Sequence, residues 1–188
     1  GRRYSAESFD RIIKLDFLSQ LESLKVVSFQ RVEFAFPLNL RKLTLSLLSA
    51  PGLHTRFEQN KLPWNKISAI AELPNLEVLK LSGAFVGETW EMGEGTFPKL
   101  RFLKLAYLDI VRWTASCDDF PPLQKLVLEG CAKLEDVPSC LGDIPTIEVI
   151  EVKWCHKSTA SLVKQIQEQQ MDMGNECLKI FIQENFKS

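Results

Sequence analysis

The sequence has no long apolar run, no glycosylation sequon and no regular cysteine framework. No stretch of its 188 residues approaches the roughly 20 apolar residues that a membrane-spanning helix needs, and no signal peptide is recognisable. No asparagine begins an N-x-S/T sequon, and the five cysteines are an odd number at neither disulfide nor zinc spacing. We therefore expect a cytoplasmic chain with reduced thiols and no transmembrane segment. Because it begins at Gly1, we also expect it to be part of a longer protein.

Catalytic and cofactor-binding patterns are also missing. The only two histidines, His54 and His156, stand outside any metal-ligand spacing. Cys155 precedes His156, but neighbouring residues of an extended segment point to opposite faces, which disfavours a nucleophile and base pair. No G-x-x-x-x-G-K-[ST] phosphate loop occurs. We therefore expect no enzyme activity and no catalytic, cofactor-binding or metal-binding residue in this chain.

Positively and negatively charged residues are nearly balanced in the composition. The chain has 23 Lys and Arg against 24 Asp and Glu, a formal net charge of -1. Binding to nucleic acid or to an anionic membrane needs a concentrated basic face, which this balance gives no reason to expect. Apolar residues make up 45% of the sequence, which is ample for the core of one domain.

What the sequence does contain is a recurring L-x-x-L-x-L motif. Four copies begin at Leu40, Leu76, Leu100 and Leu123, and two looser copies begin at Leu21 and Ile147. The steps between the six starting positions are 19, 36, 24, 23 and 24 residues. A period of 23 to 24 residues with this motif is typical of leucine-rich repeats.

The motif predicts a short strand in each copy. Its fourth and sixth residues point to one face of the strand and the residues between them point to the other, because side chains alternate along a strand. One copy cannot bury its own leucines, whereas stacked copies join them into one core and their strands into one parallel sheet. We therefore predict an α/β solenoid, a leucine-rich-repeat horseshoe with a parallel concave sheet and an irregular convex side.

Proline and phenylalanine mark the entry to several of these strands. Phe97-Pro98 and Phe120-Pro121 each precede a motif, and proline ends a return segment because it has no backbone donor and disfavours helix in the residue before it. The predicted strands cover residues 24–28, 42–46, 78–82, 102–106, 125–129 and 149–153.

The remaining segments complete a two-part organisation. Residues 1–155 hold the six copies, with a convex helix expected over 5–20 and a protruding loop at 48–64. The 36-residue step that contains this loop could instead hide a degenerate extra repeat. Residues 156–188 are expected to form a terminal cap, which a solenoid needs to cover its open end.

Sequence signals also define the elements of this cap. Ser158 or Thr159 is expected to cap a helix that runs to about Met171, with Val163 on its apolar side. Gly174 stops this helix, and the alternating apolar residues that follow, Leu178, Ile180 and Ile182, predict a final strand.

Cysteine and tryptophan recur at equivalent positions of the repeat. Cys131 and Cys155 lie eight residues after the first leucine of their copies, where we expect them to face the core as small apolar side chains. Trp90 and Trp113 lie 14 and 13 residues after theirs, and we expect them to pack on the convex side. Trp154 is open between packing at the end of a strand and surface contact.

The concave face is the expected binding surface. Lysines and apolar residues are mixed on the third and fifth positions of the motif, and aromatic residues beside cations suit a protein interface. The alternative is a solvated sheet face on which exposed lysines discourage association. The candidate protein-binding residues are Lys80, Phe102, Lys104, Tyr107, Lys125 and Glu151. The loop around His54 is the other possible contact surface.

Several strings resemble a known protein family. They include LPWNKISAIAELPNLEVLKL, GTFPKLRFLKL, FPPLQKLVLEGCAKLEDVPSCLGDIPTIEVIEVKWC and SLVKQIQEQQMDMGNECLKIFI. They are similar to the C-terminal leucine-rich-repeat region of plant intracellular nucleotide-binding leucine-rich-repeat (NLR) immune receptors. Within these, the coiled-coil type of the nightshade family is the most similar.

The resemblance implies a function in disease resistance. A coiled-coil domain and a nucleotide-binding switch that holds ADP or ATP would precede this segment, and no residue of the nucleotide site lies within it. The expected partners are the receptor's own nucleotide-binding domain, a pathogen effector, a guarded host protein or a partner receptor, and the expected output is hypersensitive cell death. The alternative is a leucine-rich-repeat substrate adaptor of a ubiquitin ligase.

Overall fold

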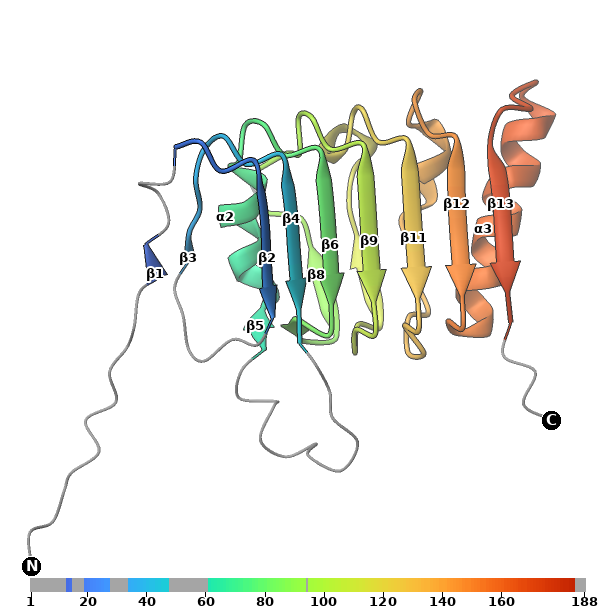
Figure 1. The fold of residues 1–188 in the computed structure, drawn as a ribbon. Coiled ribbons are helices and arrows are strands. Elements are labelled where there is room, and N and C mark those ends of the chain that lie inside the picture. Colours follow the sequence, from blue (N-terminus) through green and yellow to red (C-terminus); the bar gives the residue numbers. More distant parts are fainter. Residues whose placement is uncertain (1–12, 15–18, 28–33, 48–60, 94, 185–188) are drawn as a thin grey trace, which may run out of the picture.

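A seven-stranded parallel sheet dominates the computed structural model, which describes residues 13–14, 19–27, 34–47, 61–93 and 95–184 (Figure 1). The strands are placed in space in their order along the chain. They are β2 (Ser23–Val27), β4 (Lys42–Ser46), β6 (Val78–Ser82), β9 (Phe102–Ala106), β11 (Lys125–Glu129), β12 (Val149–Lys153) and β13 (Lys179–Gln183). Few helices accompany the sheet, and this arrangement is compatible with a solenoid.

The leucines of the motif are in register across the sheet. Leu43 pairs with Leu79, Leu79 with Leu103, Leu103 with Leu126 and Leu126 with Ile150. All five side chains are fully buried. Each copy therefore contributes the fourth and sixth residues of its motif to one continuous core, as the repeat period predicts.

The six predicted strands are confirmed, although β2 begins and ends one residue before the predicted range. The predicted final strand is also confirmed as β13. The 36-residue step adds no strand to the sheet between its flanking copies, because β4 and β6 pair directly with each other. The alternative of an extra repeat in this step is therefore wrong for the sheet.

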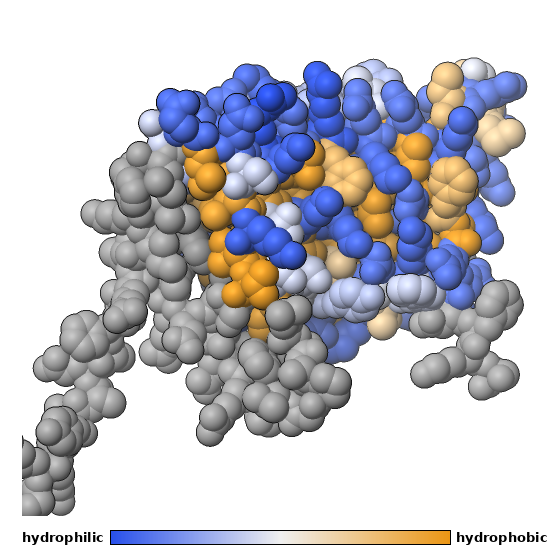
Figure 2. Space-filling model, viewed as in Figure 1, coloured by the Kyte–Doolittle hydropathy of each residue, from blue (hydrophilic) through white to orange (hydrophobic). Residues whose placement is uncertain are grey.

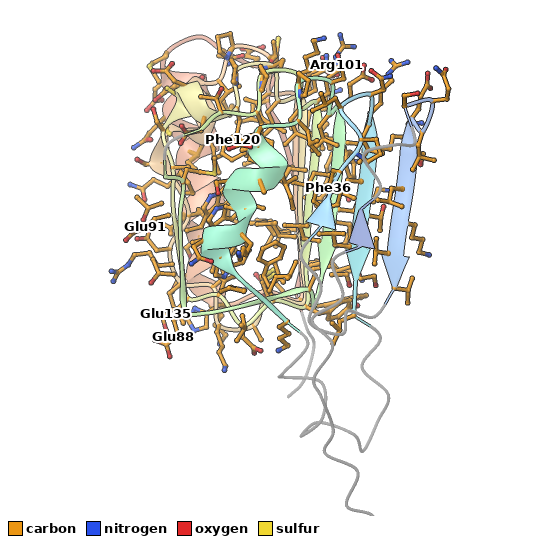
Figure 3. The ribbon with its side chains drawn as sticks, turned by 90° about the vertical axis from the view of Figure 1, so that its left-hand side faces the viewer. Phe36, Glu88, Glu91, Arg101, Phe120 and Glu135 are labelled. Carbon is orange, nitrogen blue, oxygen red and sulfur yellow. The ribbon has the colours of Figure 1, made fainter. Side chains whose placement is uncertain are left out.

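The back of the sheet is covered by short, varied elements. They are β5 (Leu62–Pro63), η2 (Trp64–Ile67), α2 (Ser68–Ala71), β7 (Phe85–Val86), β8 (Thr89–Glu91), β10 (Arg112–Thr114), η3 (Cys117–Asp119) and η4 (Ser139–Asp143). The irregular back was predicted, but its small parallel pairs, β5 with β7 and β8 with β10, were not. Buried side chains of this layer, such as Phe120, lie between it and the sheet, whereas Glu91 of β8 points outward (Figure 3).

Stacked aromatic rings fill that space. Trp90 stacks on Trp64 with ring centroids 4.8 Å apart and on Trp113 with centroids 5.0 Å apart. Phe97 stacks on Phe120 at 5.4 Å, and Phe120 meets Trp113 edge to face. Trp90 and Trp113 thus pack on the back of the sheet, as expected.

A residue with left-handed backbone conformation directly follows four of the sheet strands. Gly83, Tyr107, Gly130 and Trp154 have φ between 51° and 64°. The backbone N–H of each donates a hydrogen bond to the backbone carbonyl of the last residue of the next strand. The turn thus adds one hydrogen bond to the pairing of the two strands. A Cβ on Gly130 would lie 2.5 Å from the Tyr107 ring, which explains the glycine there.

The terminal helix, α3 (Lys157–Asp172), lies beside β12, β13 and η4. Its N-cap is His156, whose ring nitrogen accepts a hydrogen bond from the Ser158 backbone N–H, so the predicted cap at Ser158 or Thr159 is wrong. Thr159 is instead fully buried and donates its hydroxyl to the Leu134 carbonyl. The tertiary contact outcompetes the local capping preference of threonine.

The helix expected over residues 5–20 is not present in the described part of that range. Residues Ile13–Lys14 form strand β1, which pairs in parallel with β3 (Phe34–Ala35). The rest of the predicted helix falls mainly outside the described residues. Of the loop predicted at 48–64, residues 48–60, including His54, also lie outside the described residues. The prediction is wrong for residues 62–64, which form β5 and the start of η2.

Candidate protein-binding face

The sheet has one open face, which points away from the core and toward the viewer in Figure 1. It consists of the first, third and fifth residue of each sheet strand, because alternate side chains leave the sheet on the same side. Figure 2 shows hydrophilic and hydrophobic side chains interspersed on this face. All six candidate binding residues belong to it or directly follow it.

Lys80 and Phe102 lie together on the open face. The Lys80 ammonium is 5.4 Å from the centroid of the Phe102 ring, a cation–π distance. Lys80 is exposed, whereas Phe102 is half-buried beneath it. This pair comes from adjacent strands, β6 and β9, and presents an aromatic surface next to a positive charge.

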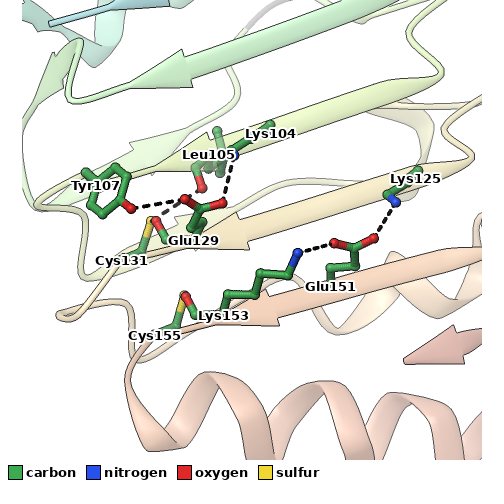
Figure 4. Close-up of polar contacts among 9 residues, drawn as sticks. All are labelled: Lys104, Leu105, Tyr107, Lys125, Glu129, Cys131, Glu151, Lys153 and Cys155. Atoms are coloured by element: carbon green, nitrogen blue, oxygen red, sulfur yellow. Dashed lines mark hydrogen bonds and ion pairs between the residues drawn. The ribbon is translucent and has the colours of Figure 1, made fainter. Parts of the chain in front are cut away.

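Lys104 and Tyr107 converge on a residue outside the candidate set, Glu129 (Figure 4). The Lys104 ammonium lies 2.7 Å from one Glu129 carboxylate oxygen, and the Tyr107 hydroxyl donates to the other at 3.0 Å. Tyr107 is one of the few exposed large apolar side chains in the described part of the chain. The left-handed backbone at Tyr107 turns its ring across Gly130 toward β11, so backbone conformation positions this aromatic group.

Lys125 and Glu151 form an ion pair with each other. A second cation, Lys153, lies 2.8 Å from the other oxygen of the Glu151 carboxylate. Glu151 is therefore held between two lysines from β11 and β12 (Figure 4). The side chains of this trio are partly shielded from water, which reduces screening of the ion pairs.

These contacts shift the ionisation of the groups involved. The ammonium of Lys104 lowers the pKa of Glu129, and those of Lys125 and Lys153 lower the pKa of Glu151. The hydrogen bond to Glu129 raises the pKa of Tyr107, because the carboxylate stabilises the protonated phenol. Both glutamates are therefore ionised at neutral pH, and the centre of the face is a fixed network of ion pairs.

Sequence reasoning missed Glu129 and Lys153. Both occupy the seventh position of the motif, counted from its first leucine, whereas only the third and fifth positions were considered for the concave face. The same alternation places all three positions on one side of the sheet. Extending the alternation by two residues identifies both of them from the sequence.

The described residues offer no metal centre. They contain no group of three or more His, Cys, Asp or Glu side chains that could hold an ion. All five cysteines are free thiols. Cys131 is buried, as expected, and its sulfur lies 3.7 Å from the Leu105 carbonyl oxygen, whereas Cys155 is half-buried.

The thiols of Cys131 and Cys155 influence each other. The neighbouring Cys155 thiol and burial raise the pKa of Cys131, whereas the neighbouring Cys131 thiol lowers the pKa of Cys155. The ring nitrogen of His156 caps α3 and is therefore not a base for Cys155.

In the described part of the chain, no helix has the length and apolar character to cross a membrane.

Comparison with known proteins identifies similar sequences. No protein-family model matches the chain. Late blight resistance protein R1-A of Solanum demissum is 34% identical over 198 residues, which cover 82% of this chain and 15% of that protein. From the same species, putative late blight resistance protein homolog R1B-16 is 38% identical over 129 residues, or 66% of this chain and 10% of that protein.

A third relative extends the match along the chain. This further putative late blight resistance protein homolog, also from Solanum demissum, is 31% identical over 215 residues, which cover 90% of this chain and 17% of that protein. The chain therefore spans between 10% and 17% of the length of these three relatives.

Proposed function

Because this chain is NLR-like and homologous to late blight resistance proteins of Solanum demissum, we propose that it is the leucine-rich-repeat segment of a plant disease-resistance receptor. In this role it is a protein-interaction surface and not an enzyme. The in-register sheet with one open, charged and aromatic face is the observation that carries the proposal. Stacked repeats create extended surfaces of this kind, which solenoid proteins use for binding.

The proposed partners follow from that role. The segment contacts the nucleotide-binding domain of its own receptor in the resting state, and a pathogen effector, a guarded host protein or a partner receptor on activation. ADP or ATP is bound outside these 188 residues, and the receptor acts in the cytoplasm to trigger hypersensitive cell death. The similarity to resistance proteins favours this function over that of a ubiquitin-ligase adaptor.

A substitution on the open face of the full-length receptor tests this proposal. Tyr107→Asp replaces an exposed aromatic side chain with a carboxylate, and aspartate tolerates the left-handed backbone there. The matched control is Glu91→Lys, an exposed charge change on the back of the sheet (Figure 3). The readouts are leaf cell death without challenge and resistance on challenge with the late blight pathogen.

We expect Tyr107→Asp to change one of the two readouts at normal protein abundance, and Glu91→Lys to change neither. Wild-type behaviour of Tyr107→Asp and of Lys125→Glu in both readouts would overturn the proposal. Protein abundance is measured by immunoblot for every variant, so that loss of the receptor is not mistaken for loss of an interface.

A further inference from the structure

Two lysines of the open face form ion pairs with carboxylates in the same relative position. Lys104 faces Val127 in the register of β9 and β11, and it pairs with Glu129, two residues further along β11. Lys125 faces Val149 in the register of β11 and β12. It pairs with Glu151, again two residues further along the neighbouring strand. The neutralising carboxylate thus occupies a diagonal position one strand away.

The same diagonal positions carry no carboxylate in the other half of the face. Lys25 faces Thr44, and the residue two further along β4 is Ser46. Lys80 faces Lys104, and the residue two further along β9 is Ala106. Within the described residues, each of these two lysines therefore lacks the carboxylate partner that its counterparts in β9 and β11 possess.

Lys42 meets a second lysine at this position. It faces Val78, and the residue two further along β6 is Lys80. Lys80 is thus next to Lys42 on one diagonal and directly opposite Lys104 on the other side. Like charges in such positions repel and lower stability. The contact that the Lys80 ammonium makes is with the uncharged Phe102 ring, at 5.4 Å from the centroid.

The charge of the open face differs from that of the chain. Its three rows contain seven lysines and two glutamates, an excess of five positive charges, whereas the whole chain has a net charge of -1. In β2, β4 and β6 the face contains three lysines and no acidic residue. Among the described residues none of the three has an ion pair, and all three are exposed. We call Lys25, Lys42 and Lys80 the basic strip.

We infer that the basic strip docks an acidic segment of a partner protein, whose Asp or Glu carboxylates take the diagonal positions that Glu129 and Glu151 occupy in the other half of the face. This inference rests on the proposed function of the chain as a protein-interaction segment, and it specifies the chemistry of the partner and the half of the face that it uses.

The surroundings of the strip favour a protein over a nucleic acid. The neighbouring side chains Thr44, Ser46 and Ser82 present hydroxyl groups that hydrogen-bond to carboxylates or to a peptide backbone. Val27 is an exposed apolar side chain on the same face and gives contact area to aliphatic groups of a peptide. The strip offers three ammonium groups and no guanidinium, whereas phosphate recognition commonly uses arginine forks.

Binding by the purified full-length receptor tests the inference. The probes are a fluorescent acidic peptide of alternating glutamate and glycine and a fluorescent RNA duplex of matched charge. The test variant is Lys25→Glu/Lys42→Glu/Lys80→Glu. The control, Lys66→Glu/Lys157→Glu/Lys164→Glu, changes three exposed lysines outside the sheet and alters the net charge by the same amount. The neutral variant Lys25→Gln/Lys42→Gln/Lys80→Gln guards against misfolding of the charge-reversed protein.

We expect both strip variants to bind the acidic peptide about tenfold more weakly or worse, and the control to stay within about twofold of wild type. Equal binding by the strip and control variants would overturn the inference. Tighter, strip-dependent binding of the RNA duplex than of the peptide would also overturn it, in favour of nucleic acid. If Tyr107→Asp still alters receptor output in leaves while the strip variants do not change peptide binding, the proposed function stands and only this inference fails.

Discussion

The rings of Trp90 and Trp113 stack in parallel planes, with centroids 5.0 Å apart and an interplanar angle of 5°. The two residues are register partners in β8 and β10, so the small back sheet aligns them. Both side chains are buried, and neither indole N–H has a hydrogen-bond partner within the described part of the chain. The stack thus combines a large apolar contact with two unpaired donors.

The first prediction concerns this stack. Trp113→Ala should lower the free energy of unfolding by about 3–5 kcal/mol, because it removes a large buried ring and leaves a cavity. Trp113→Phe should cost less, since it retains part of the ring contact and removes an unpaired donor whose burial is unfavourable. Urea unfolding followed by circular dichroism measures both. An equal loss for the two substitutions would contradict the importance of ring stacking.

The second prediction tests the register of the sheet. Leu103 is fully buried between β6 and β11, so Leu103→Ala should lower the free energy of unfolding by about 2–5 kcal/mol. The control is Lys80→Ala in the adjacent strand, which is exposed and should change stability by no more than about 0.5 kcal/mol. Lys104→Ala is a poorer control, because Lys104 has an ion pair with Glu129. Equal thermal midpoints for Leu103→Ala and Lys80→Ala would refute the register.

The third prediction concerns pH. The pKa values of Glu129 and Glu151 are lowered in the folded protein by their lysine partners, so the folded state binds protons less readily than the unfolded state. Their contribution to stability is therefore fully present above the ordinary glutamate pKa of about 4.3 and is lost as the pH falls through the folded-state pKa. Urea midpoints measured between about pH 3 and pH 7 should decline at the acidic end.

A double substitution identifies the groups responsible. Glu129→Gln/Glu151→Gln should be less stable than wild type at neutral pH and should show a shallower decline below about pH 4.3. Glu148→Gln, at an exposed position just before β12, should retain the wild-type profile. If the double variant declines as steeply as wild type, the ion pairs do not set the acid sensitivity.

The fourth prediction concerns the thiols. All five cysteines are free, so a reductant should leave the thermal midpoint unchanged. Under native conditions a maleimide reagent should label the exposed Cys177 first and the buried Cys131 last, since burial excludes the reagent and the pKa of Cys131 is raised. Mass spectrometry of labelled peptides gives the order. Early labelling of Cys131 or a large drop in midpoint with reductant would contradict the described packing.

Local preference predicted some elements and misjudged others. Gly174 was expected to end α3, and the helix does end two residues before it. The cap at the other end was missed, because Thr159 makes a buried hydrogen bond to a loop 25 residues earlier in the chain. Residues Ile13–Lys14 were expected in a helix, but their pairing with Phe34–Ala35 makes them a strand. In both cases a contact distant in sequence overrides the local signal.

The sequence by itself determined the sheet. A motif repeated every 23 to 24 residues places leucines at alternating positions, and only stacking of the copies can bury them. It also identified the open face and the five candidate residues that lie in strands, because alternation assigns each strand residue to one side, whereas Tyr107 directly follows β9.

Only the tertiary structure decided which charges on that face are free. Lys80 and Lys104 are equivalent in the sequence pattern, yet Lys104 has a carboxylate partner and Lys80 has a phenylalanine ring. The difference arises because a lysine reaches diagonally across to a neighbouring strand, so its partner depends on the register between copies and on a residue about 25 positions away. A period in the sequence gives the spacing of the copies, but the pairing of their side chains is fixed only when the strands are aligned.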